Sequence, residues 1–106
     1  MLRRTTAIAA ALSLLALGSP LIAARANPSF VEYFTQGVER YNSGNYREAL
    51  ANYTKAIEIN PQDADAYTNR GSARELVNDL TGACSDWRKA VNLGNERPAE
   101  WVKKQC

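Results

Sequence analysis

Hydrophobic residues recur three and four positions apart from residue 30 onward, which is the spacing of one face of an α-helix. The first such stripe consists of Phe30, Phe34, Val38 and Tyr41. A second stripe covers residues 46–57, and Ser43-Gly44-Asn45 between the two is typical of a turn. Pro61 ends the second stripe because a residue before proline avoids helical geometry. The pattern predicts a helical hairpin over about residues 30–63.

The same pattern continues through a second hairpin and a short last helix. We expect helices from about Ala64 to Val77 and from Leu80 to Leu93, with Asn78-Asp79 as the turn and Gly94 as a left-handed cap. Residues 98–106 follow, with a helix over Pro98 to Gln105. Trp101 and Val102 would cover the apolar edge of the second hairpin, while Glu100, Lys103 and Lys104 face solvent. We therefore predict an all-α fold of five helices.

The two predicted hairpins are related by an internal repeat of 34 residues. At this offset six residues are identical: Tyr33 and Tyr67, Gly37 and Gly71, Arg40 and Arg74, Ala49 and Ala83, Lys55 and Lys89, and Ala56 and Ala90. Tyr53 also aligns with Trp87, so an aromatic residue is kept. Small residues such as Gly37, Ala49 and Ala56 would let paired helices approach closely beside these aromatic rings. A period of 34 residues is characteristic of one helical repeat.

On these residues and on Pro61 the chain resembles the tetratricopeptide repeat family. The resemblance implies an α-α superhelix with repeat 1 at about residues 30–63, repeat 2 at about 64–97 and a capping helix at about 98–106. Asn95 stands where the pattern expects a second proline, which indicates that the repeats end there.

The resemblance also implies a concave groove that holds an extended peptide or a partner helix. The groove positions that correspond in this chain are Val31, Phe34, Val38, Tyr41, Asp65, Thr68, Asn69, Ser72 and Glu75. The first four are apolar and the rest polar or acidic, which indicates a ligand with an apolar anchor followed by polar or basic residues. The clamp that some family members use on acidic tails expects Lys or Arg and Asn. Phe34 and Val38 replace the first two such positions, and only Asn69 matches it. Alternatively, the apolar face packs under the start of the mature chain or against a second copy.

Residues 1–26 have the order of a secretion signal. Arg3 and Arg4 precede an apolar run from Ala7 to Leu17, and Ala24-Arg25-Ala26 suits cleavage after Ala26. We predict export to a periplasmic or extracellular space, with residues 27–106 as the mature domain. The alternative is an uncleaved membrane anchor over residues 5–24, which Gly18 and Pro20 disfavour.

Cleavage would change the charge of the protein. The full chain has 13 basic and 11 acidic residues, and removal of three arginines in the leader leaves ten basic residues against the eleven acidic ones. A mature charge of about −1 gives no support to nucleic-acid binding, which needs a clustered basic face. Arg70 and Arg74 are expected to pair with acidic residues across the helices.

Cys84 and Cys106 are the two cysteines, and an even number in a small exported chain suggests a disulfide. If the chain turns at Asn95, the two residues lie eleven positions on either side of it and face each other. Trp87 and Trp101 are roughly opposed in the same way. The alternatives are a buried Cys84 with a frayed Cys106, or a redox-active dithiol, although such pairs usually occur as Cys-x-x-Cys.

Little in the sequence indicates catalysis or a cofactor. The chain has no histidine, so the commonest general base and metal ligand is missing. Asp63 and Asp65 flank Ala64, but aspartates at a helix start more often act as caps. We therefore expect no enzyme, no metal and no cofactor, and interpret the chain as an interaction module for a protein partner. A self-associating or envelope-assembly component is the first alternative, and a thiol-disulfide redox protein is the second.

Overall fold

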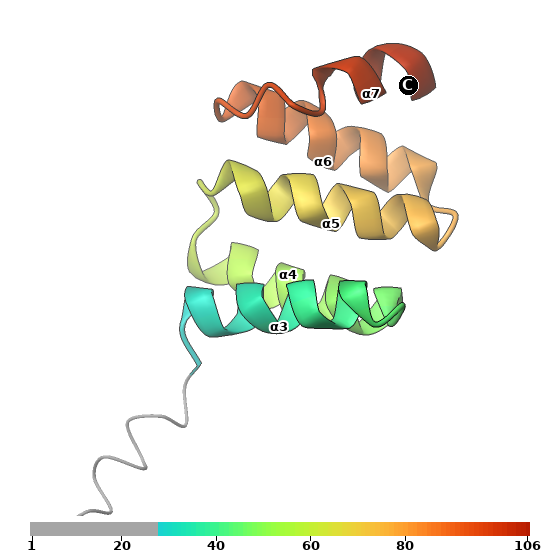
Figure 1. The fold of residues 1–106 in the computed structure, drawn as a ribbon. Helices are drawn as coiled ribbons and strands as arrows, with labels where there is room; N and C mark the ends of the chain where they lie inside the picture. Colours follow the sequence, from blue (N-terminus) through green and yellow to red (C-terminus); the bar gives the residue numbers. More distant parts are fainter. Residues whose placement is uncertain (1–27) are drawn as a thin grey trace, which may run out of the picture.

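A computed structural model describes residues 28–106, which form five α-helices and contain no strand. The helices are α3 (Phe30–Asn42), α4 (Tyr46–Ile59), α5 (Ala64–Leu76), α6 (Leu80–Asn92) and α7 (Ala99–Gln105). Figure 1 shows the hairpins α3–α4 and α5–α6 stacked in chain order, with α7 packed on α6. The all-α prediction is confirmed, and the predicted signal peptide lies outside the described residues.

Side chains at the helix starts cap the first backbone amides. Asp63 Oδ1 accepts a hydrogen bond from the Ala66 amide at 2.9 Å, and Asp79 Oδ1 accepts one from the Gly82 amide at 2.9 Å. Each bond satisfies an amide that has no partner within its own helix. Asp63 is therefore a helix cap, as its position before Ala64 predicted.

Three of the four connections between the described helices contain a residue in a left-handed backbone conformation. Gly44 has φ +82°, Asn78 has φ +66° and Gly94 has φ +106°. The left-handed residues Asn78 and Gly94 follow closely after α5 and α6. These helices therefore end at Leu76 and Asn92, one residue before the predicted ends at Val77 and Leu93. The last helix likewise begins at Ala99, because Pro98 occupies the cap position before it.

Two aromatic rings pack where the facing helix has a glycine. A β-carbon added at Gly37 would lie 2.5 Å from Tyr53 Cε1, and one at Gly71 would lie 2.6 Å from Trp87 Cδ1. Both rings are buried, and each is only 1% exposed. These contacts confirm the prediction that small residues let aromatic side chains fill the space between paired helices.

The short helix α7 is attached to α6 at two points. A disulfide joins Cys84 and Cys106, whose Cα atoms lie 5.8 Å apart, within the usual range for such bonds. The rings of Trp87 and Trp101 meet edge to face with centroids 5.4 Å apart. The structure thus brings together both pairs that the spacing around Asn95 predicted.

Asn95 fastens the loop before α7 to the start of α5. Its side-chain amide donates hydrogen bonds to Asp65 Oδ1 at 2.9 Å and to Thr68 Oγ1 at 3.0 Å. A proline at this position would provide neither bond. The departure from the repeat pattern at Asn95 therefore has a structural role of its own.

Candidate functional site

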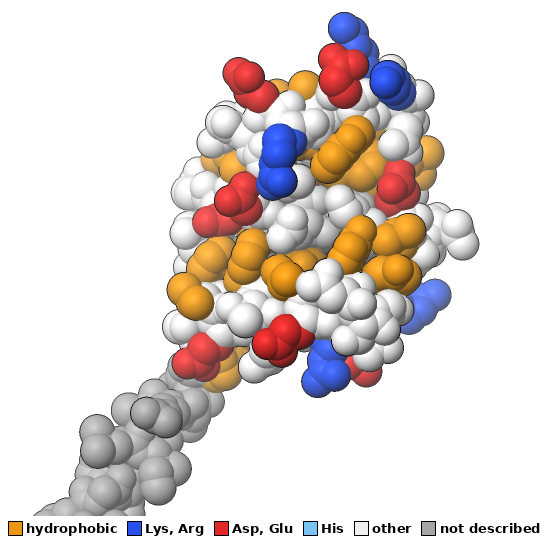
Figure 2. Space-filling model, in the orientation of Figure 1, with side chains coloured by type: hydrophobic (Ala, Val, Ile, Leu, Met, Phe, Trp, Pro, Cys, Tyr) orange, Lys and Arg blue, Asp and Glu red, His pale blue; other side chains and the backbone are white. Residues whose placement is uncertain are grey.

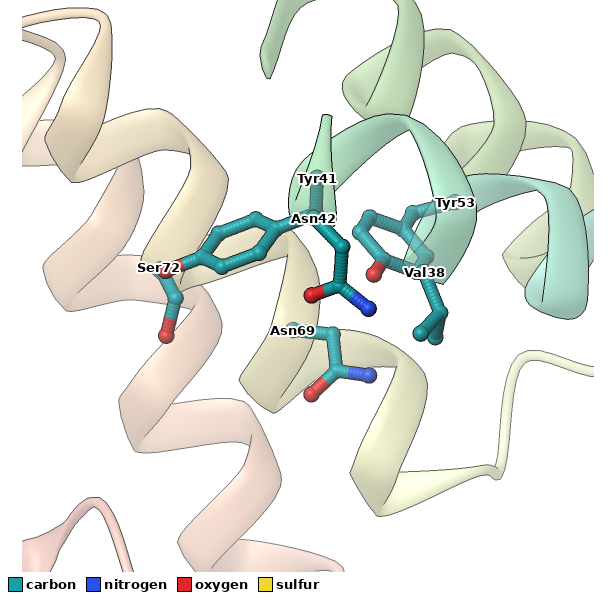
Figure 3. A pocket seen from close by; sticks show the side chains of 6 residues that line it. All are labelled: Val38, Tyr41, Asn42, Tyr53, Asn69 and Ser72. Atoms are coloured by element: carbon teal, nitrogen blue, oxygen red, sulfur yellow. The ribbon is translucent and has the colours of Figure 1, made fainter. Parts of the chain in front are cut away.

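The face formed by α3 and α5 carries a pocket of about 240 Å³. Its lining comes from three helices and consists of Val38, Tyr41, Asn42, Tyr53, Asn69 and Ser72. Figure 3 shows Asn42 from α3 lying above Asn69 from α5, with Tyr41 and Tyr53 on either side. The pocket therefore combines an aliphatic and aromatic wall with amide and hydroxyl groups.

Helical spacing and one glycine create this wall. Val38, Tyr41 and Asn42 lie within one turn of α3, so their side chains project toward the same face. Tyr53 belongs to α4 and reaches the pocket because Gly37 leaves room for its ring between the two helices. A side chain at position 37 would close that route.

Hydrophobic side chains gather along the boundary between α3 and α5, as Figure 2 shows, with polar surface next to them. Phe34, a predicted groove residue, is partly buried and packs against the hydrophobic core. Its ring lies 5.6 Å from the Phe30 ring and 5.9 Å from the Tyr53 ring, measured between centroids. Phe34 therefore contacts the pocket residue Tyr53 without lining the pocket itself.

Burial keeps the phenols of this pocket protonated. It raises the pKa of Tyr53 to about 12, against a smaller lowering by a hydrogen bond with Asn69. Burial also raises the pKa of Tyr41, and the neighbouring Tyr46 and Glu75 raise it further. At neutral pH both side chains are therefore uncharged hydroxyl groups.

The pKa of Tyr53 predicts a specific loss of stability at alkaline pH. Since its folded pKa of about 12 lies above its ordinary value of 10.0, the protonated phenol stabilises the fold below pH 10 and loses this contribution as the pH rises toward 12. We expect Tyr53→Phe to shift the midpoint of alkaline unfolding to higher pH, measured by circular dichroism. Tyr33→Phe, which removes a phenol outside the pocket, is the control. An unchanged midpoint in Tyr53→Phe would contradict the prediction.

The structure divides the nine predicted groove residues into groups. Val38, Tyr41, Asn69 and Ser72 line the pocket together. Val31 is 66% exposed and lines none of the pockets described in residues 28–106. Asp65 lies near the other end of α5, where its carboxylate accepts from Asn95 and lies 3.7 Å from Arg97 Nη2.

Thr68 is buried, which removes it from the predicted groove. Its residue is only 2% exposed, and its hydroxyl donates to the Ala64 carbonyl at 3.0 Å while accepting from Asn95. The loop before α7 covers this position, so Thr68 cannot contact a partner in this conformation. The helical register of α5 alone does not predict that Asn95 covers Thr68.

Two lining residues were absent from the predicted groove set. Asn42 follows Val38 by four residues on the same face, so the α3 register could have identified it. Tyr53 lies on α4, outside the helices that the resemblance assigns to the groove. The sequence signal for Tyr53 is its position opposite Gly37 in the hairpin, where no side chain blocks its ring.

A buried ion cluster holds the basic residues of α5 away from this face. Arg70 donates to both carboxylate oxygens of Asp86 at 2.9 Å, and Arg74 Nη1 donates to Asp86 Oδ2 at 2.9 Å. Asp86 is 2% exposed. The structure thus confirms that Arg70 and Arg74 pair with an acidic residue on the facing helix.

Within residues 28–106 no helix is both long and apolar enough to cross a bilayer. Nor do three or more His, Cys, Asp or Glu side chains come together there in a group that could hold a metal ion.

Comparison with known proteins agrees with the repeat architecture. A family model described as TPR repeat matches residues 37–76. Tetratricopeptide repeat protein 36 is 40% identical over 60 residues in Danio rerio and 40% identical over 62 residues in Homo sapiens, covering 57% and 58% of this chain. The matched segment spans about a third of each, at 32% and 33% of their lengths. Hsp70-Hsp90 organizing protein 1 of Glycine max is 34% identical over 58 residues, which is 55% of this chain and 10% of that protein.

The family model covers parts of both helical hairpins, and the relatives carry the family's name. Tetratricopeptide repeats form protein–protein interaction modules. Over residues 37–76 the chain is thus similar to the tetratricopeptide repeat family.

Proposed function

We propose that this chain is an extracytoplasmic interaction module that binds a peptide or a partner helix across α3 and α5. The observation that carries the proposal is the pocket lined by Val38, Tyr41 and Asn69. Its volume of about 240 Å³ is below the usual range for small-molecule sites, which begins at about 300 Å³. The pocket is thus suited to one side chain of a larger partner.

The lining offers that partner both apolar surface and hydrogen-bonding groups. Val38, Tyr41 and Tyr53 provide apolar surface for an aliphatic or aromatic side chain. Asn42 and Asn69 each provide an amide that can donate to and accept from a partner's polar groups. A binding role needs no catalytic group, and the chain has no histidine.

Two features support an extracytoplasmic setting for this function. The leader pattern of residues 1–26 is typical of an exported protein. The disulfide between Cys84 and Cys106 would persist in an oxidising compartment and be reduced in the cytosol.

The soybean relative is named for organising Hsp70 and Hsp90, which supports a protein as the partner. An acidic tail does not suit this pocket as a ligand. Phe34 and Val38 occupy two positions where the corresponding clamp expects Lys, Arg or Asn. The pocket residues instead favour an apolar anchor.

A displayed peptide library selected on the full chain would test the proposal. We expect selected peptides to share an aliphatic or aromatic residue and to bind Val38→Ser about tenfold more weakly than wild type, since a buried valine contributes about 1.5 kcal/mol or more. Fluorescence anisotropy with a synthetic selected peptide gives the affinities. Val31→Ser makes the same chemical change on the same helix but outside the pocket, so it should bind as wild type does.

The alternatives predict other outcomes. Equal losses in Val38→Ser and Val31→Ser would move the binding site out of the pocket. A concentration-dependent dimer in sedimentation that excludes the peptide would instead support self-association through α3. Circular dichroism of each variant checks that the helices remain formed.

A further inference from the structure

A second pocket lies beside the first, between the carboxyl-terminal end of α5 and the helix α7. Its volume is about 290 Å³. The exposed or half-buried side chains that line it are Tyr41, Ser72, Glu75, Leu76, Trp101 and Gln105. Tyr41 and Ser72 line both pockets, so the two pockets adjoin.

Glu75 is the one charged residue in this lining. Within residues 28–106 its carboxylate takes part in no ion pair, although six pairs are formed there by other groups. Asp65, the other acidic residue of the predicted groove, already has Arg97 and Asn95 as partners. Glu75 is thus the acidic group of this face that still lacks a positive counterpart.

The surroundings of Glu75 are those that a basic side chain prefers. Tyr41 and Trp101 present aromatic rings, whose faces attract an ammonium or guanidinium group. Leu76 can cover the aliphatic part of a lysine or arginine chain, which packs on apolar surface while its charged end stays near a carboxylate. No basic residue of the described chain lines the pocket and competes for it.

We propose that this second pocket, formed by Tyr41, Glu75 and Trp101, binds a lysine or arginine side chain of the partner. The proposal rests on the proposed function, because the apolar anchor of the same partner would occupy the first pocket. The expected occupant is a basic peptide segment. The uncompensated charge of Glu75 between aromatic side chains carries the assignment.

The shared wall also predicts the spacing of the two residues in the partner. In an extended peptide, residues two positions apart point to the same side and lie about 6.6 Å from each other. We assign this spacing to the two pockets because they share Tyr41 and Ser72. We therefore expect an apolar residue and a basic residue at positions i and i+2, in either order along the peptide.

Short fluorescent peptides of defined sequence test this assignment on the full chain. One contains leucine with lysine two positions away, a second has glutamine in place of lysine, and a third has glutamate. We expect the wild-type protein to bind the lysine peptide about fivefold more tightly than the glutamine peptide and to bind the glutamate peptide most weakly. Glu75→Gln should reduce the preference for lysine over glutamine to less than about twofold.

Glu58→Gln is the matched control, because it removes an equal charge from the exposed end of α4, away from Tyr41. It should keep the fivefold preference. The side-chain N–H signal of Trp101 in a nitrogen-proton spectrum should shift with the lysine peptide in wild type and move less in Glu75→Gln. This readout reports the pocket directly and would not respond to a general loss of charge.

The possible failures separate this inference from the proposed function. Equal binding of the lysine and glutamine peptides, together with a loss in Val38→Ser, would overturn the basic pocket and keep the apolar one. Equal loss of preference in Glu58→Gln and Glu75→Gln would also overturn the assignment, since overall charge would then explain the effect. Absence of binding by all three peptides and by every peptide of the selected library would overturn both.

Discussion

Replacement of Asp86 by alanine is expected to lower the free energy of unfolding by about 3 to 4 kcal/mol, because it leaves two arginines without their shared carboxylate. The Asp86 side chain is 3% exposed, and Arg70 is 14% exposed. Arg70 therefore cannot recover its lost bonds from bulk water without moving. Chemical denaturation of the full chain, followed by circular dichroism, measures the loss.

The reason for so large an effect is the position of the cluster. Arg70 lies on α5 and reaches Asp86 on α6 with two hydrogen bonds of 2.9 Å, while its third nitrogen lies 3.4 Å from Thr54 on α4. One side chain thus connects both helical hairpins. Two repeats bury little apolar surface between them, so a connection across the seam has a large share in their association.

Two comparisons identify the cause of the loss. Glu58→Gln removes a carboxylate from an ion pair with Lys55 that is more than half exposed, and it should change the stability by less than about 0.5 kcal/mol. The double variant Arg70→Met with Asp86→Leu replaces charges by apolar groups of similar volume and should recover at least half of the loss. A loss in Asp86→Ala no larger than that in Glu58→Gln would show that the cluster contributes little.

Asp86 also shows what the sequence could and could not predict. The expectation that Arg70 and Arg74 face an acidic residue followed from their place on the inner side of α5. The positions around the Asn78-Asp79 turn place Asp86 opposite Arg70, just as those around Asn95 place Cys84 opposite Cys106. The equivalent position in the first repeat is Asn52, so the 34-residue comparison concealed the charge.

Helical periodicity predicts which face a residue occupies more reliably than how far it is buried. Thr68 and Asn69 are neighbours on α5, and both were expected in the groove. Asn69 lines the pocket, whereas the Asn95 side chain covers Thr68. That difference depends on a loop 27 positions away in the sequence, which the pattern of a single helix cannot include.

The second pocket has the same origin. Tyr41 and Glu75 are predicted groove residues, whereas the sequence predicts that Trp101 covers the apolar edge of the second hairpin. The structure puts Trp101 in the lining next to Glu75. A helix that closes the hydrophobic core of a repeat array can therefore also extend its binding face.

Cys106→Ser is expected to lower the free energy of unfolding by about 3 kcal/mol under oxidising conditions and to have almost no effect in reductant. The disulfide joins residues 22 positions apart and restricts the unfolded chain accordingly. The substitution is best made at Cys106, which is exposed, because Cys84 is 6% exposed and a hydroxyl there would be buried. For a domain of this size the melting temperature should fall by more than about 10 °C.

The Cys106→Ser variant also tests whether the disulfide maintains the proposed second pocket. Trp101 lies five residues before Cys106 on α7, and its contact with Trp87 is the second attachment of that helix. If the disulfide holds Trp101 beside Glu75, Cys106→Ser should lose most of the preference for a lysine peptide while it still binds the leucine anchor. The wild-type protein in reductant should behave in the same way. Equal destabilisation of Cys106→Ser in oxidant and in reductant would show that the serine side chain, and not the missing bond, is responsible.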